Sequence, residues 1–106
     1  MPFPGKGIVM VDLTSRITYA NSLVCDLLET TPSEIIGKSC FDLVFPDDVG
    51  RAKELFQANL EPEALPFRIK LRRTDGNPVL MDVQGAPLRV ANGPVYGIIA
   101  TVIPVE

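Results

Sequence analysis

Residues 7–21 read Gly7-Ile-Val-Met-Val-Asp12-Leu-Thr-Ser-Arg16-Ile-Thr-Tyr-Ala-Asn21, and this stretch decides the fold. It begins with a β-branched run, continues with turn-forming residues from Asp12 to Arg16, and then alternates again, which is typical of a β-hairpin. Asn21 follows at once, and its side chain can accept a hydrogen bond from the first turn of a helix. The segment therefore predicts two antiparallel strands that lead directly into a helix.

Short helices are predicted to follow, up to about residue 62. Behind Asn21, four apolar residues share one helix face: Leu23, Val24, Leu27 and Leu28. Thr31-Pro-Ser-Glu34 is a helix-start signal, with Thr31 as the N-cap, and Gly37 ends that helix. Residues 40–45 form a further apolar turn. The longest helix is expected to start at Pro46-Asp-Asp48, with one of the two aspartates as its cap, and to end at Pro62.

The remainder of the chain reads as three strands. Phe67-Arg-Ile-Lys-Leu-Arg72 alternates apolar and basic residues, as a strand with one solvated face does. The tight-turn pairs Asp75-Gly76 and Asn92-Gly93 bracket a second strand, and the last strand runs over 95–105. Because the helices lie between two blocks of strands, we expect an α+β fold with a five-stranded antiparallel sheet.

The amino-acid composition excludes several classes of function. The chain has 106 residues, 46% of them hydrophobic, so one domain over 1–106 is expected. A net charge of −3 without a basic patch argues against nucleic-acid partners, and no apolar run nears the ~20 residues that span a bilayer, so we expect a cytoplasmic domain without membrane contact. Histidine is absent, which excludes the Ser-His-Asp triad and histidine metal ligands, so the domain itself is expected to be non-catalytic.

Four stretches in this order and spacing resemble the PAS family: Gly7–Asp12, Arg16–Asn21, Glu34–Lys38 and Phe45–Asp48. The resemblance covers nearly the whole chain. It implies a five-stranded antiparallel sheet of order 2-1-5-4-3, short helices on one face, and a cavity between helices and sheet. It further implies a sensory or signal-relay module of a larger, bacterial signalling protein such as a two-component sensor histidine kinase, joined covalently to an effector domain.

Cofactor binding can be tested against particular residues. Cys40 stands three residues after Gly37, the offset of the photoreactive cysteine in flavin-binding light sensors of this family. However, Phe41 replaces their arginine, Ser39 their asparagine, and Val44 or Leu43 stands near the expected glutamine, so polar recognition of a flavin is weakened. Haem sensors of the family use histidine, which this chain lacks. We therefore predict neither flavin nor haem, no metal, and unpaired thiols at Cys25 and Cys40.

A ligand pocket is predicted from the apolar positions, with three polar points. The expected lining is Tyr19, Leu27, Ile36, Cys40, Phe41, Val44, Leu55, Phe56, Phe67 and Gln84. Such a lining suits a small apolar or weakly polar ligand, and it suits a filled core equally well.

The first and last strands are apolar in both alternation phases, which predicts an apolar strip on the outer sheet face if they lie side by side. We expect this strip to form a homodimer interface of Ile8, Met10, Ile98, Ala100 and Val102. Three readings follow: a ligand-sensing module, a ligand-free dimerisation or protein-interaction domain of a transcription regulator or cyclic-dinucleotide enzyme, and, least favoured, a flavin photosensor using Cys40.

Overall fold

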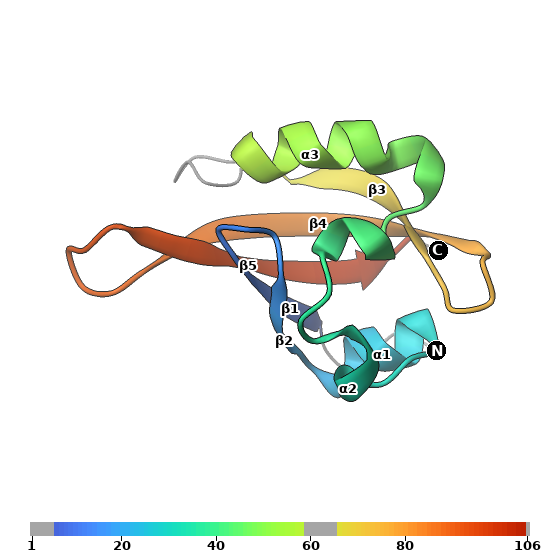
Figure 1. Cartoon of the computed structure of the whole chain (residues 1–106). Helices are drawn as coiled ribbons and strands as arrows, with labels where there is room; N and C mark the ends of the chain where they lie inside the picture. Colours follow the sequence, from blue (N-terminus) through green and yellow to red (C-terminus); the bar gives the residue numbers. More distant parts are fainter. Residues whose placement is uncertain (1–5, 59–65, 106) are drawn as a thin grey trace.

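The computed structural model describes residues 6–58 and 66–105. Its elements are β1 (Gly7–Asp12), β2 (Ile17–Ala20), α1 (Ser22–Leu28), α2 (Pro32–Ile35), the 3-10 turns η1 (Cys40–Leu43) and η2 (Pro46–Asp48), α3 (Val49–Ala58), β3 (Phe67–Arg72), β4 (Pro78–Arg89) and β5 (Val95–Pro104). Figure 1 shows α1 and α2 gathered near β2, at one edge of the sheet, and α3 beside β3, at the opposite edge. The predicted order of strands and helices is confirmed.

All five strands form one antiparallel sheet in the order β2-β1-β5-β4-β3, as the family resemblance implied. β5 is third in this order and therefore the central strand, with β1 on one side and β4 on the other. β4 and β5 are the two longest strands and form the long hairpin that extends beyond the rest of the sheet in Figure 1. The first strand and the last therefore lie side by side, with Val9 opposite Ala100 and Val11 opposite Ile98.

The turn between β1 and β2 depends on the Asp12 carboxylate. Its Oδ1 atom accepts hydrogen bonds from the backbone N–H of Thr14 at 2.9 Å and of Arg16 at 3.0 Å, and from the Thr14 hydroxyl at 2.6 Å. These bonds favour the charged carboxylate and lower the pKa of Asp12 below its ordinary value. Asp12 is thus the turn former that the sequence predicts.

The junction between β2 and α1 is organised by Asn21. Its Oδ1 atom accepts from the backbone N–H of Val24 and of Ile8, both at 3.1 Å, and its Nδ2 atom donates to the Lys6 carbonyl at 3.0 Å. One side chain therefore caps α1, as predicted, and also joins that helix to the start of β1. At the other end of α1, Glu29 adopts a left-handed conformation with φ 57° and ends the helix.

Two predicted caps are wrong in detail. The side chain of Thr31 makes no bond to the α2 backbone, and its hydroxyl instead donates to Glu34 Oε1 at 3.1 Å. The Asp48 carboxylate accepts a hydrogen bond from the backbone N–H of Lys70 at 2.9 Å. It therefore pairs with a backbone group at the exposed edge of β3 and does not cap a helix. The helix end predicted at Pro62 lies outside the described residues.

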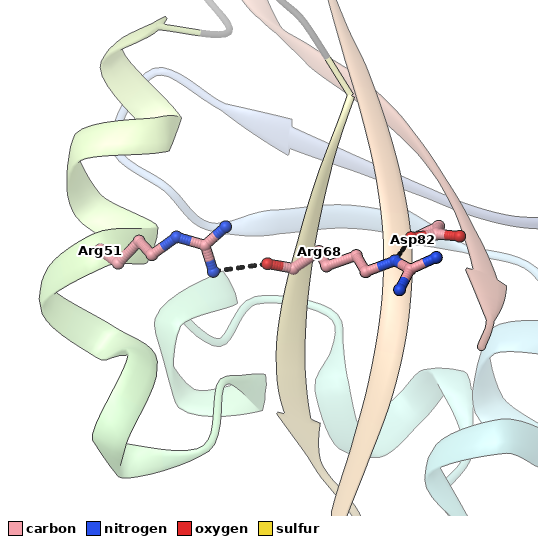
Figure 2. Close-up of polar contacts among 3 residues, drawn as sticks. All are labelled: Arg51, Arg68 and Asp82. Carbon is pink, nitrogen blue, oxygen red and sulfur yellow. Dashed lines mark hydrogen bonds and ion pairs between the residues drawn. The ribbon is translucent and has the colours of Figure 1, made fainter. Parts of the chain in front are cut away.

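Helix α3 is held against β3 by an arginine. Arg51 donates from Nη1 to the backbone carbonyl of Arg68, and the Arg68 side chain continues across the sheet to Asp82, with 2.7 Å between Nε and Oδ1 (Figure 2). Figure 2 shows Arg51 on the α3 side of β3 and the Arg68–Asp82 pair pointing away from it. This chain of contacts joins the helical layer to the outer face of the sheet.

The core lies between the helices and one face of the sheet. Met81 is fully buried there, and Ile98 is only 4% exposed. Because neighbours across the strands share a face, the register sets Ile98, Ala100 and Val102 on this inner face with Val9 and Val11. The prediction that Ile98, Ala100 and Val102 share the outer face with Ile8 and Met10 is therefore wrong.

Replacing Asn21 by alanine tests the junction of β2, α1 and β1. Asn21→Ala removes the acceptor of two backbone N–H groups, so we expect the free energy of unfolding to fall by about 2 kcal/mol. Urea denaturation followed by circular dichroism measures this fall. The control Ser22→Ala changes the adjacent, exposed helix residue and should shift stability by less than ~0.5 kcal/mol. Equal losses in both variants would contradict the assigned role.

Candidate functional site

A cavity of about 120 Å³ lies between the helical segments and the inner face of the sheet. Its walls come from β1, η1, α3, β3, β4 and β5, whereas β2, α1, α2 and η2 contribute no lining residue. The lining residues are Val9, Val11, Cys40, Phe41, Leu43, Val44, Ala52, Phe56, Phe67, Ile69, Leu71, Val83, Ile98, Ala100 and Val102. Such a lining is almost wholly aliphatic and aromatic.

The helical wall of the cavity is set by η1. The Ser39 hydroxyl accepts from the backbone N–H of Phe41 at 3.3 Å, and the backbone N–H of Cys40 donates to the Ser15 carbonyl at 2.7 Å. The first bond caps η1, and the second attaches η1 to the β1–β2 turn, so that Cys40 and Phe41 lie over the sheet. The Phe41 ring meets the Phe56 ring of α3 edge to face, with centroids 5.7 Å apart, which closes the wall between η1 and α3.

Five of the predicted pocket residues line this cavity: Cys40, Phe41, Val44, Phe56 and Phe67. The other five are placed elsewhere. Tyr19 and Ile36 are each 45% exposed, and Gln84 is exposed on the outer face of the sheet. Leu27 is buried in the core and Leu55 is half-buried against it, but neither lines the cavity.

Most of the strand residues that form the sheet side of the cavity are absent from the pocket predicted from the sequence. Ile98, Ala100 and Val102 were assigned to the outer face, whereas Val9, Ile69 and Val83 were not named. Each of these residues belongs to the alternate set of its strand that faces the helices, and each lies opposite a residue of the neighbouring strand that faces the same way. The basic residues that alternate with Phe67 and Ile69 already marked the inner phase of β3, and could have been used to find this wall.

The Cys40 thiol is the one polar group that the lining side chains bring to the cavity, counted over residues 6–58 and 66–105. Burial disfavours the charged thiolate and raises the pKa of Cys40 to about 11. The thiol therefore stays protonated at neutral pH and behaves as a weak hydrogen-bond donor. Cys25 is buried, and its pKa is also raised by burial. Both cysteines are free, as predicted.

The residues around Cys40 do not fit a flavin. Phe41, Ser39 and Val44 supply neither the cation nor the amide partners that a flavin would require. The cavity also falls below the ~300 Å³ at which pockets for drug-sized ligands begin. Within the two described ranges, no three His, Cys, Asp or Glu residues come together as metal ligands would. Those ranges also contain no helix of the length and apolar character needed to span a membrane.

Comparison with known proteins agrees with this architecture. Residues 5–103 match the PAS domain family. The chain belongs to that family. The five-stranded antiparallel sheet of order β2-β1-β5-β4-β3 is therefore that of a PAS domain.

Two relatives represent different kinds of parent protein. The C4-dicarboxylate transport sensor protein DctS of Rhodobacter capsulatus is 28% identical over 104 residues, which cover 93% of this chain and 16% of that protein. The aryl hydrocarbon receptor nuclear translocator homolog of Drosophila melanogaster is 30% identical over 60 residues, which cover 57% of this chain and 9% of that protein. The chain thus spans less than a fifth of either relative.

Solved structures share the fold. The PAS domain of a protein from Colwellia psychrerythraea superposes with a TM-score of 0.86 at 19% identity, covering 94% of this chain and 86% of that one. A light-oxygen-voltage domain, studied with a flavin analogue, superposes with a TM-score of 0.77 at 21% identity, covering 95% of this chain and 78% of that one. At these identities the likeness concerns the fold alone.

The buried thiol predicts a strongly pH-dependent reactivity. Because the thiolate is the nucleophile and the pKa of Cys40 is about 11, alkylation by iodoacetamide should be slow at pH 8 and should accelerate as pH rises towards 11. Mass spectrometry of the alkylated peptides gives the rate at each cysteine. Cys40→Ser reports the background from Cys25. Alkylation of Cys40 at pH 8 as fast as that of free cysteine would contradict its burial.

Proposed function

We propose that this PAS domain is a ligand-sensing module that relays occupancy of its cavity to an attached effector domain. The observation that carries the proposal is the apolar cavity beside Cys40, which is walled by both the helical layer and the central strands. A molecule in this space contacts η1 and α3 on one side and β5 on the other. Binding therefore has a direct physical route to both layers of the fold, and the domain itself requires no catalytic group for this role.

The ligand class follows from the size and lining of the cavity. An apolar cavity of ~150 Å³ can bind benzene, and the cavity here is about 120 Å³. A compact apolar molecule fits these limits, with the Cys40 thiol as the nearest weak donor. A flavin or haem group does not fit them, so a colourless purified protein is expected. Its absorption spectrum tests that point.

The parent protein is proposed from the relatives. The match to DctS over 93% of this chain favours a bacterial sensor protein of the two-component type, with the effector domain covalently attached to a PAS domain that lies in the cytoplasm. The match to the nuclear translocator homolog is shorter and favours the alternative, a protein-interaction domain of a transcription regulator. Either parent would use this domain for signal transduction.

Self-association is a second candidate function, supported by the outer sheet face. The outer face of the sheet, which points away from the cavity, carries Ile8 and Met10 on β1, Ile99 and Ile103 on β5, and Tyr19 on β2. Met10 lies directly between Tyr19 and Ile99, so these three side chains form one apolar strip across three strands. Ile103 is 41% exposed and Tyr19 is 45% exposed. A second copy of the domain that covers this strip would remove it from water.

Filling the cavity tests ligand sensing. Ala52 lines the cavity from α3 and is buried, so Ala52→Leu should occupy the space that a ligand would take. With benzene as the probe at about ten times its Kd, we expect the melting temperature of the unmodified domain to rise by roughly 5 °C, because only the folded state binds. The variant should show no such rise.

The matched control is Ala58→Leu, which adds the same side chain to an exposed position of α3. This control should respond to benzene as the unmodified domain does. If Ala52→Leu fails to fold, the smaller change Ala52→Val should still weaken the response. An equal response in Ala52→Leu and Ala58→Leu, or no response in the unmodified domain, would overturn the proposal.

Charging the outer strip tests self-association. Met10→Lys and Ile99→Lys each place a cation in the centre of the strip, so we expect either change to convert a dimer into a monomer. Sedimentation velocity at several protein concentrations measures the change. Gln57→Lys, on the exposed side of α3, adds the same charge and should leave the dimer intact. A monomer at all concentrations in the unmodified domain would refute the interface.

A further inference from the structure

A second, polar groove of about 420 Å³ lies outside the apolar cavity. It is bounded by the last residues of α1, by α2 with the residues that follow it, by η1, and by the segment that joins β3 to β4. Figure 1 shows the β3–β4 turn coming down towards α1, where Thr74 donates from its backbone N–H to the Leu28 carbonyl at 3.1 Å. The volume is within the ~300–1,000 Å³ range of small-molecule sites.

Three cations stand around this groove: Lys38, Arg72 and Arg73. Arg73 is half-buried, and its Nε atom donates to the Leu27 carbonyl at 3.3 Å. Arg72 donates from Nη2 to the Asp42 carbonyl at 3.0 Å. Each guanidinium is thus oriented by one backbone oxygen and keeps further N–H donors. In the described ranges, no carboxylate lies within ion-pair distance of any of the three cations. Two oriented guanidinium groups that are not in an ion pair suit the planar carboxylate of a ligand.

The groove also has acidic and apolar parts. The carboxylates of Glu34 on α2 and Asp42 on η1 line it, and in the described part of the chain neither is in an ion pair. Leu28, Ile35 and Leu43 supply an apolar floor, of which Leu28 and Ile35 are almost fully buried. A dianion would meet repulsion from Glu34 and Asp42, whereas a molecule with a carboxylate, an ammonium group and an aliphatic side chain has a partner for each part.

We propose that this groove binds a free amino acid with an aliphatic side chain. The carboxylate lies against Arg72 and Arg73, the ammonium group faces the carboxylates of Glu34 and Asp42, and the side chain covers the leucine and isoleucine floor. The site is separate from the apolar cavity: apart from Leu43, the two share none of their lining residues. The groove therefore provides a second input to the same domain, through α1, α2 and the β3–β4 turn.

Nuclear magnetic resonance titration of the isotope-labelled domain tests this proposal. L-Leucine should cause saturable amide shifts at Thr30, Lys38 and Thr74, and should leave the cavity residue Ala52 unaffected. L-Leucinamide lacks the carboxylate, N-acetyl-L-leucine lacks the ammonium group, and succinate carries two carboxylates. Each of these three should bind about tenfold more weakly or worse, since each loses charged hydrogen bonds or meets repulsion.

Variants identify the groups that bind. Arg72→Gln should weaken L-leucine binding about tenfold or more. Arg89→Gln should not, although Arg89 is also an exposed arginine that donates to a backbone carbonyl. Asp42→Asn should weaken binding through the ammonium group, while Asp26→Asn on the exposed side of α1 should not. If Arg72→Gln does not fold, Arg73→Gln removes the other guanidinium that faces the carboxylate and gives the same test.

Several results would overturn the proposal. One is the absence of saturable shifts up to roughly 10 mM L-leucine, which corresponds to no useful affinity. Another is binding of succinate or N-acetyl-L-leucine as tightly as L-leucine, which would show an anion site rather than a zwitterion site. A third is equal weakening by Arg72→Gln and Arg89→Gln. None of these results bears on benzene binding in the apolar cavity, so the two proposals fail independently.

Discussion

The pairing of β5 with both β1 and β4 is the constraint on which the rest of the structure depends. It brings the end of the chain next to its beginning and sets which side chains face the helices. The close approach of β1 and β5 requires glycine at position 97, because a Cβ atom there would lie 2.3 Å from the carbonyl oxygen of Val11. With this register in place, Val11 and Ile98 face the cavity, and Met10 and Ile99 face away from it.

Local signals in the sequence were sufficient to predict the order of helices and strands. Asn21 is followed by a helix because its side chain can replace a missing backbone partner, and Asp12 forms a turn for a similar reason. The inner and outer faces of β3 could also be predicted, since only one phase of Phe67–Arg72 is apolar. The order of strands in the sheet came from the family resemblance, because tight-turn residues identify hairpins but not the pairing of β1 with β5.

The faces of β1 and β5 could not be predicted from the sequence, for a physical reason. Alternation distinguishes two faces only if one is polar, and in these central strands both are apolar. Because of that ambiguity, Ile98, Ala100 and Val102 were exchanged with Ile99 and Ile103, and the β1 and β5 wall of the cavity was left out of the predicted site. The prediction that Tyr19 and Gln84 line the pocket is wrong for a related reason. Each has a suitable side chain, but its position in the strand directs that side chain away from the helices.

The two apolar faces of the central strands support a common explanation for sensing and relay. One face lines the cavity and the other forms the outer strip, so a displacement of β5 by a ligand acts on both. A second connection runs through α3, where Ala52 lines the cavity and its neighbour Arg51 bonds to the β3 backbone. From Arg68 the connection continues to Asp82 (Figure 2). Asp82 is paired with Ile103 of β5, which lies on the outer face. The Arg68–Asp82 pair is largely exposed and contributes little stability, so it can rearrange at low cost when α3 moves. Packed layers transmit small shifts rather than absorb them, so under the proposed function a ligand in even a small cavity would act on the face on which a partner would bind.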